Sequence, residues 1–551
     1  MSLKNKLSTV LFVLIAVLGT AQTINNDKLI QERVVLTTDR TIYFAGEQIL
    51  LKANCLLPLN NDSLSRVLYV ELLDKKSKPV LQKKLVISQG VATAVIPVPE
   101  EVITGNYYLR AYTQYMRNFN TDKFYTNELM LVNPDLQAKE AIQTAVDSAR
   151  KKDTGKEVIA IAGTTTSFLS NSLVSLNLKG KNNSNVSVSV VTKGSYEPEA
   201  VGIQNYFQTK EPVDAVKLNW YPELRSVSIS GKVVDKASNQ PLKNIFVYAS
   251  IVDSAKQFHV AKTNEEGFFI FSLTNLQENH TVYVCAEVEG TILINSDFAA
   301  GLPAMHYNAI KMDSLKLSMI NAMYENAQVS KMYNEEPVPV KTYLDAIPDP
   351  FKSTGEVIYL KDYVALPQFT DYFKEIIPYT RIKTRQELPT IQLVDRRNKE
   401  FFEHPLVMVD NIPFRNHGDL LSIAPSKINS VTVIASKYVF GKEVLNGVIM
   451  VKTKESNLGG LPLPAEVVSV DYIACDPLVS VPIQKENTFS VSKPGLRNTL
   501  YWNPSVNLKG GQQTIQFYTS NTISDYDVVV RGVDDDGNEF TQIKTIKVTT
   551  K

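Results

Sequence analysis

The sequence predicts a mainly β protein made of tandem β-sandwiches and one α+β domain. Short apolar runs alternate with polar residues, as in Val186-Ser-Val-Ser-Val-Val191, and this period of two is typical of strands. Clusters of turn-forming residues such as Leu59-Asn-Asn-Asp62 separate the runs. A chain of 551 residues is also too long for one hydrophobic core, so several domains are expected.

Residues 1–21 are predicted to be a secretory signal peptide. Lys4 and Lys6 precede an apolar run, and Gly19-Thr20-Ala21 supplies small residues for cleavage before Gln22. The alternative is an uncleaved anchor helix, but the run is short for that, and no later segment is apolar enough to span a bilayer. The expected location is therefore outside the cytoplasm.

Residues 22–134 are expected to form the first sandwich. Thr38-Asp39-Arg40, Tyr43, Gly46-Glu47 and the closing strand Gly105–Tyr112 follow one another in an order that resembles a macroglobulin-type domain. Residues 135–224 are expected to hold a helix or linker over 135–153 and then a second macroglobulin-like sandwich, because Val174-Ser-Leu-Asn-Leu-Lys alternates strictly.

Residues 225–300 resemble a carboxypeptidase-regulatory (transthyretin-like) sandwich. The resemblance rests on Gly231-Lys-Val-Val-Asp235 and on Glu266-Gly-Phe-Phe269. Such a domain implies a rigid spacer and no peptidase. Residues 301–355 are predicted to be a helical linker, since Leu315, Met319 and Met323 recur at helical spacing within 309–334.

Residues 356–455 resemble the plug domain of TonB-dependent outer-membrane receptors. The resemblance rests on Pro405-Leu-Val-Met-Val-Asp410-Asn-Ile-Pro413, on Asp419–Ala435, and on Asn446-Gly-Val-Ile-Met-Val-Lys-Thr453. A 22-stranded receptor barrel needs ~10 residues per strand plus loops, which the remaining residues 456–551 do not provide. Those residues, with Tyr501-Trp-Asn-Pro504, are expected to form a separate C-terminal sandwich. The whole order resembles a set of exported Bacteroidetes proteins.

The charge balance gives no reason to expect nucleic acid or an anionic membrane as a partner. Lys and Arg total 58 and Asp and Glu total 57, so no basic excess exists to bind phosphates. The widely spaced Cys55, Cys285 and Cys475 do not form a disulfide framework, although one disulfide stays open as an alternative.

Candidate chemical motifs all have a simpler structural interpretation. Ala45-Gly46-Glu47-Gln48 matches the thioester motif Cys-Gly-Glu-Gln except for the thiol, so no thioester and no protease trapping are expected. Asp534-Asp535-Asp536-Gly537-Asn538 is better explained by a hairpin turn than by a Ca²⁺ loop. The five histidines show no zinc spacing; they are His259, His280, His306, His404 and His417.

No catalytic, cofactor-binding or metal-binding residues are predicted, and no cofactor. Phe440-Gly441-Lys442 lacks the rest of a phosphate-binding loop, and no nucleophile elbow occurs. Asp410, Tyr438, Gly441 and Asn446-Gly447 are expected to be turn and packing positions.

The expected function is therefore that of a non-enzymatic structural or assembly subunit in the periplasm, associated with the outer membrane. The resemblance implies docking to an outer-membrane β-barrel complex, such as a SusC-type transporter, a secretion translocon or the barrel-assembly machinery. Two alternatives stay open. One is a glycan- or peptide-binding module that uses Trp220 and Trp502 as a platform, and the other is a surface-exported adhesin.

Overall fold

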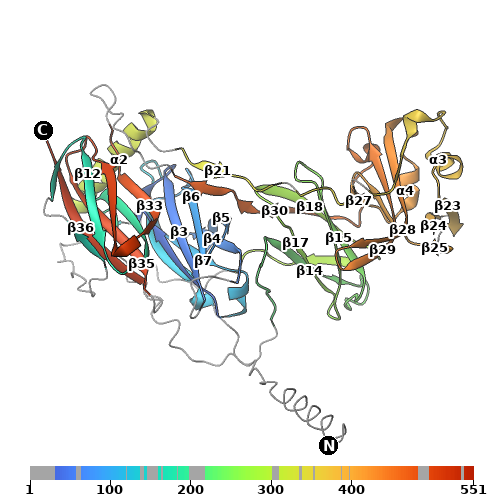
Figure 1. Cartoon of the computed structure of the whole chain (residues 1–551), viewed down its shortest axis with the longest axis horizontal. Helices are drawn as coiled ribbons and strands as arrows, with labels where there is room; N and C mark the ends of the chain where they lie inside the picture. Colours follow the sequence, from blue (N-terminus) through green and yellow to red (C-terminus); the bar gives the residue numbers. More distant parts are fainter. Residues whose placement is uncertain are drawn as a thin grey trace, which may run out of the picture.

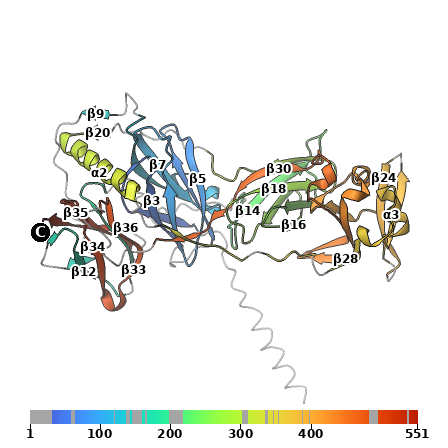
Figure 2. The same cartoon turned by 90° about the horizontal axis from the view of Figure 1, so that it is seen from above.

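The chain forms a row of four β-rich units (Figures 1 and 2). The predicted fold class, mainly β with tandem sandwiches and one α+β domain, is confirmed. The expected signal peptide, residues 1–21, lies outside the described residues. The computed structural model describes residues 31–57, 64–119, 121–136, 142–144, 159–162, 166–182, 184–197, 218–300, 310–333, 338–345, 347–351, 354–385, 388–395, 398–481, 495–534 and 539–550.

The first sandwich packs a sheet of order β1-β3-β6 against a sheet of order β2-β8-β7-β4-β5-β31. Strand alternation explains its core, since Leu51 and Ala53 of β3 lie on the core face, while Lys52 between them lies on the opposite face, which the second sandwich covers. Its own elements are β1 (Arg33–Thr38), β2 (Ile42–Phe44), β3 (Gln48–Leu56), β4 (Val67–Leu73), β5 (Pro79–Val86), β6 (Val91–Pro97), β7 (Gly105–Tyr112), η1 (Tyr115–Asn118), η2 (Thr121–Lys123) and β8 (Tyr125–Val132).

The second sandwich is built from two segments that are far apart in the sequence. Strand β12 pairs with β34, and β13 lies between β33 and β35, so residues 160–192 and 499–549 share both sheets. The expectation of two separate sandwiches in 135–224 and 456–551 is therefore wrong, because each segment alone supplies only part of each sheet. The strands are β10 (Ala160–Ala162), β11 (Ser167–Leu169), β12 (Leu173–Lys179), β13 (Asn185–Thr192), β33 (Thr499–Asn507), β34 (Gln512–Tyr518), β35 (Asp525–Val533) and β36 (Glu539–Thr549), with η6 (Lys509–Gly511) before β34.

The third sandwich has sheets of order β17-β14-β19 and β16-β15-β18-β30. Gly231 on β14 allows a close approach, since a Cβ there would lie 2.4 Å from the Leu293 carbonyl oxygen. The strands are β14 (Ser228–Val234), β15 (Phe246–Ile251), β16 (Gln257–Lys262), β17 (Phe268–Ser272), β18 (Asn279–Ala286), β19 (Thr291–Ile294) and β30 (Val468–Ile473).

The distal domain, residues 354–467, combines a sheet of order β22-β28-β29-β26-β27, a small sheet β23-β24-β25 and two short helices. One face of its main sheet packs on its own helices, with Val431 and Val451 in that core. The other face packs on the third sandwich, where Met408 meets Tyr248 and Phe258. The elements are β22 (Glu356–Tyr359), η3 (Leu360–Asp362), α3 (Phe369–Glu375), β23 (Thr380–Arg385), β24 (Leu388–Asp395), β25 (Glu400–Phe402), β26 (Leu406–Val409), β27 (Ile412–Pro413), α4 (His417–Leu421), η4 (Pro425–Lys427), β28 (Ile428–Phe440), β29 (Glu443–Thr453) and η5 (Leu458–Gly460).

Residues 468–480, which we call the return segment, join three different sheets in succession. Strand β30 pairs with β18 of the third sandwich, β31 (Cys475–Asp476) with β5 of the first, and β32 (Leu478–Ser480) with β21 (Val340–Thr342). This part of 456–551 therefore does not belong to the C-terminal sandwich that was expected there.

The helix expected within 309–334 is α2 (Ser314–Tyr333). It packs on the first sandwich, where Ile320 and Met323 contact Ile42 and Phe44. Before it, β20 (Ile310–Met312) pairs with β9 (Ile142–Thr144). The helix or linker expected over 135–153 lies mostly outside the described residues, and β9 is extended. No helix in the part of the chain that the structure describes is long and apolar enough to cross a membrane.

Candidate functional site

The signature Thr38-Asp39-Arg40 forms a buried hydrogen-bonded cluster in the first sandwich. The Tyr43 hydroxyl donates to Asp39 Oδ1 at 2.8 Å, and the Leu50 amide donates to the same oxygen at 3.1 Å. Arg40 lies between two carboxylates, 3.3 Å from Asp39 Oδ2 and 3.4 Å from Glu47 Oε2. These groups are nearly inaccessible to water, so each charge is stabilised by its oppositely charged neighbour and not by solvent.

The same cluster connects the first sandwich to the second. The Thr499 hydroxyl on β33 donates to Asp39 Oδ2 at 2.7 Å, and the Asn498 side-chain amide donates to Glu47 Oε1 at 3.4 Å. Lys52 lies at this junction too, with its Nζ 3.2 Å from Asn185 Oδ1, and burial lowers the pKa of Lys52 to about 8.

The thioester-like stretch has a structural role in this cluster. Gly46 adopts a φ of 80°, which favours glycine, and it forms the turn between β2 and β3. The Glu47 carboxylate accepts a hydrogen bond from the Phe44 amide at 2.8 Å and pairs with Arg40. These contacts agree with the interpretation of Gly46-Glu47 as a turn and a strand entry.

The junction of the first and third sandwiches surrounds a buried lysine. Lys84 is fully inaccessible, and its Nζ lies 2.7 Å from Asp297 Oδ2 and 3.9 Å from the centre of the Tyr472 ring. The Tyr472 hydroxyl in turn donates to the Ser228 carbonyl oxygen at 2.8 Å. Tyr472 of the return segment therefore lies between the ion pair that joins the first and third sandwiches and strand β14 of the third.

Glu223 lies in the same junction and is held through one oxygen. Its Oε1 accepts hydrogen bonds from the Ser228 amide at 2.6 Å, the Ser228 hydroxyl at 2.8 Å and the Tyr69 hydroxyl at 3.2 Å. Its Oε2 is buried without a hydrogen-bond partner among the described residues. Burial raises the pKa of Glu223 to about 7, although Lys84 and the Ser228 contacts act in the opposite direction.

The raised pKa of Glu223 predicts a pH dependence of stability. The folded chain holds this proton up to about pH 7 while the unfolded chain releases it near pH 4.5, so the contribution of Glu223 to stability is fully present below pH 4.5 and is lost as pH rises through 7. The loss across this window is about 3 kcal/mol. Glu223→Gln has no proton to release, so its thermal midpoint should fall less than that of the wild type between about pH 5 and about pH 8. Equal slopes for the two proteins would contradict this.

Trp220 does not form an open platform for a sugar. The Arg117 guanidinium carbon lies 3.5 Å from the centre of its ring, and Arg117 also donates to the carbonyl oxygens of Ser296 and Asp297. Trp502 is buried on β33. One ring face of Trp220 and most of Trp502 are therefore used inside the protein, which is unfavourable for the platform alternative.

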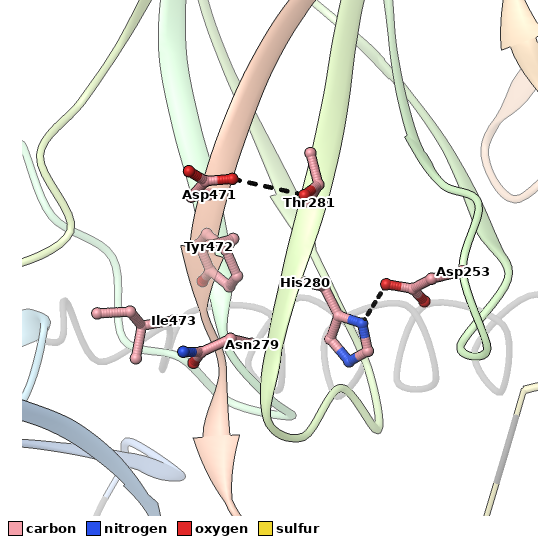
Figure 3. Close-up of a pocket in the computed structure, with 7 residues that line it drawn as sticks. All are labelled: Asp253, Asn279, His280, Thr281, Asp471, Tyr472 and Ile473. Carbon is pink, nitrogen blue, oxygen red and sulfur yellow. Dashed lines mark hydrogen bonds and ion pairs between the residues drawn. The ribbon is translucent and has the colours of Figure 1, made fainter.

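A polar pocket of about 340 Å³ opens at the end of the third sandwich (Figure 3). It lies where β18 pairs with β30, and the Thr281 hydroxyl there donates to Asp471 Oδ1 at 3.4 Å. The lining residues are Asp253, Asn279, His280, Thr281, Asp471, Tyr472 and Ile473.

Beside this pocket, His280 contacts the loop between β15 and β16 and the turn before β18. Its Nδ1 lies 2.6 Å from Asp253 Oδ2 and its Nε2 lies 2.8 Å from the Gln277 carbonyl oxygen (Figure 3 shows the Asp253 contact). Both partners are hydrogen-bond acceptors, one a carboxylate and the other a backbone carbonyl. The turn that His280 holds also contacts the outgoing and the returning chain. Gln277 Oε1 accepts a hydrogen bond from the amide of Leu344, which follows β21, and the Glu278 amide donates to the carbonyl oxygen of Cys475 in the return segment.

Two of the other histidines are largely buried, and a third, His404, lies near enough to His417 to help lower its pKa. His259 and His417 are largely buried, and burial lowers the pKa of each to about 4. His417 Nδ1 accepts a hydrogen bond from the Ile391 amide at 2.8 Å, and His404 is exposed. His306 lies outside the described residues. No group of His, Cys, Asp and Glu side chains in the described ranges could hold a metal ion.

The cysteines are free and buried, each on a strand, and burial raises the pKa of every one of them; they are Cys55, Cys285 and Cys475. The hairpin turn expected at Asp534–Asn538 is flanked by β35 and β36, which pair antiparallel from Val533 and Glu539 outward. Residues 535–538 themselves lie outside the described residues.

Asp410 organises a tight hairpin in the distal domain. Asp410 and Asn411 have φ values of 47° and 68°, as a two-residue loop between β26 and β27 requires. The Asp410 carboxylate accepts hydrogen bonds from the Thr453 amide at 2.8 Å, the Thr453 hydroxyl at 2.6 Å and the Leu458 amide at 2.9 Å. The expected turn role of Asp410 agrees with this geometry.

Asp410→Ala is expected to lower the thermal midpoint of the distal domain. It removes three hydrogen bonds to a charged acceptor and places alanine at a positive φ, with an estimated loss of about 2–4 kcal/mol. Asp410→Asn retains one acceptor oxygen and a residue that tolerates this φ, so it should lose less. An alanine variant as stable as the asparagine variant would contradict this role.

The remaining singled-out positions lie on the long hairpin of β28 and β29. Gly441 is at its tip with a φ of 60°, and the Tyr438 hydroxyl donates to the Pro350 carbonyl oxygen at 2.8 Å. Gly447 has a φ of 77°, and a Cβ there would lie 2.5 Å from a methyl carbon of Leu393. These are turn and packing roles, as expected.

Comparison with known proteins identifies no family. No family model matches the chain, and no curated protein matches it. The solved structures that resemble it include the Salmonella alpha-2-macroglobulin reacted with methylamine (9% identity, TM-score 0.24, covering 94% of this chain and 39% of that one). The native E. coli alpha-2-macroglobulin is similar at 7% identity and a TM-score of 0.24, covering 96% of this chain and 40% of the other.

A tetra-tandem repeat from the extending region of a large adhesion protein also resembles the chain, at 10% identity and a TM-score of 0.14, covering 95% of this chain and all of that one. The chain spans about two fifths of the length of the macroglobulins that it matches. Identities and TM-scores this low imply no shared activity.

Proposed function

We propose that this chain is a non-enzymatic, exported structural subunit that presents a plug-like distal domain at the end of a rigid row of sandwiches. The distal domain would dock to an outer-membrane β-barrel protein or to a complex built on one, such as a SusC-type transporter, a secretion translocon or the barrel-assembly machinery. The observation that carries this proposal is the return segment, which fixes the distal end of the row to the two sandwiches behind it.

The row of sandwiches is held rigid by contacts between the segment that leads to the distal domain and the segment that returns from it. The outgoing β21 and the returning β32 pair with each other, so two strands rather than one flexible linker lead to the distal domain. Lys83 and Lys84 of β5 form ion pairs with Asp476 and Asp297, which hold the return segment and the end of the third sandwich to the first. A structure with these restraints is suited to hold a binding domain at a constant distance.

The buried polar clusters are occupied by contacts within the chain. The charged groups around Asp39, Lys84 and Glu223 contact partners within domain junctions, where their role is to hold sandwiches together. The distal domain exposes large apolar side chains, including Val364 at 83% and Val439 at 68%, which are available for contact with a partner.

The test is recovery of the tagged chain from gently solubilised envelopes, with identification of the proteins that accompany it. We expect an outer-membrane barrel in stoichiometric amount, and its loss from a variant in which residues 354–467 are replaced by a short Gly-Ser linker. A photo-crosslinking residue at Val364 should capture the same barrel, whereas one at Leu315, which is 72% exposed on α2, should not.

Recovery of the chain alone from a soluble fraction would overturn the docking proposal. Cleavage of the chain by protease added to whole cells would in that case favour the adhesin alternative, because a periplasmic protein is shielded by the outer membrane.

A further inference from the structure

Strand β34 is an edge strand of the second sandwich that lacks the usual protection against pairing. Natural edge strands are blunted by charged residues, proline or bulges. Among the described edge strands of six residues or more, β34 (Gln-Gln-Thr-Ile-Gln-Phe-Tyr) carries neither a charge nor a proline. The other edges are protected, for example β33 by Pro504 and two bulges and β23 by Arg381 and Lys383.

The backbone groups along this edge point away from the protein at alternate residues. The Thr519 amide donates to the Ser172 carbonyl oxygen and the Gly180 amide to the Gly511 carbonyl oxygen, so odd-numbered residues of β34 face β12. Gln512, Thr514 and Gln516 therefore direct their N–H and C=O groups to the open side. Their side chains are exposed, and among the described residues the Thr514 carbonyl oxygen receives the Gln513 side-chain amide at 3.2 Å.

Two copies of β34 are compatible with antiparallel pairing in a register that places Ile515 of one copy opposite Ile515 of the other. In that register Thr514 of one copy faces Gln516 of the other, so outward backbone groups meet outward backbone groups. The apolar Ile515 faces its own counterpart on the core side, and polar pairs lie on the exposed side. No like charges meet, because β34 has no charged residue.

We propose that two copies of this chain associate by pairing their β34 strands antiparallel about Ile515. The two sheets of order β10-β12-β34 then become one continuous sheet across a twofold axis. The second sandwich lies at the end of the row away from the distal domain (Figures 1 and 2), so the paired strands are remote from both distal domains.

A single strand pair buries less than a standard interface of ~1,600 Å², so the dimer should dissociate on dilution. The test is sedimentation analysis of the full chain without the predicted signal peptide, over a series of concentrations. We expect the mass to rise from one chain to two. Thr514→Pro should abolish this rise without loss of the fold, because it removes an N–H that β12 does not use.

Charge variants test the register independently. Thr514→Lys with Gln516→Lys places lysines opposite each other in the dimer and should keep the chain monomeric, as should the double substitution to Glu. An equimolar mixture of the two should dimerise again at low salt, since each Lys then faces a Glu. The matched control is Ser175→Lys, one strand inward on the same exposed face, which should leave association unchanged.

A wild-type chain that stays monomeric over the whole series would overturn the proposal. A dimer that persists in both Thr514→Pro and the double-lysine variant would also overturn it, because association would then use another surface. Failure of the mixed charge variants to associate would exclude the register centred on Ile515.

Discussion

Replacing Arg110 with methionine is expected to lower the free energy of unfolding by about 3–5 kcal/mol, the range for breaking a buried ion pair. Arg110 and Glu71 are paired inside the first sandwich, each side chain about 1% exposed, with Arg110 Nε 2.8 Å from Glu71 Oε2. Without the guanidinium, the Glu71 carboxylate keeps, among the described residues, the hydrogen bond from the Gln82 side-chain amide at 2.8 Å. The variant leaves a buried charge without a counter-ion, and that desolvation is the source of the loss.

Arg110 also donates to the carbonyl oxygens of Ala299 and Ala300, which follow the third sandwich. The substitution should therefore loosen the junction of the first and third sandwiches as well. Urea unfolding measures the first effect, and limited proteolysis near residue 300 measures the second. The control is the double variant Glu71→Gln, Arg110→Met, which removes both charges and should recover much of the loss. A double variant as unstable as the single one would contradict the charge argument.

Asp39→Ala is expected to have an effect of similar size, about 3–5 kcal/mol, because several buried groups lose one acceptor together. Asp39 accepts hydrogen bonds from Tyr43, Leu50 and Thr499 and pairs with Arg40. Its loss affects the turn before β2 and the contact with the second sandwich at the same time. Urea unfolding should show the loss, and protease cleavage between the two sandwiches should become faster.

The control for Asp39 is Thr499→Val, which removes the hydroxyl that reaches across the junction. It should cost about 1 kcal/mol, the typical value of one hydrogen bond. If Thr499→Val destabilised the chain as much as Asp39→Ala, the effect would come from the junction alone and not from the cluster. If neither variant changed the proteolysis rate, the cluster would not hold the two sandwiches together.

Local patterns were sufficient for features that depend on neighbouring residues. The strict alternation in β12 and β13, the helical spacing in α2 and the turn at Asp410-Asn411 all follow from side chains close in sequence. The structural roles of Gly46-Glu47 and Gly447 were also predictable, because turn glycines and strand entries have local signatures.

Contacts between distant segments had no such signature. Nothing in the sequence near Lys84 indicates that Asp297 and Tyr472 meet it, and nothing near Glu223 indicates that its carboxyl is buried against Ser228 and Tyr69. A buried lysine and an exposed lysine on a strand have the same sequence pattern, because alternation reports which face a side chain is on and not what covers that face.

The sequence by itself determined a β-rich, multi-domain chain, the positions of most strands and the turn roles of its glycines and aspartates, since these follow from backbone preferences and period-two burial. Only the tertiary structure decided that residues 160–192 and 499–549 form one sandwich, and that the return segment joins sheets of the first and third. The physical reason is that a strand carries the same period-two pattern whichever edge it pairs with, so its partner is chosen by the burial and hydrogen bonds available in the folded chain.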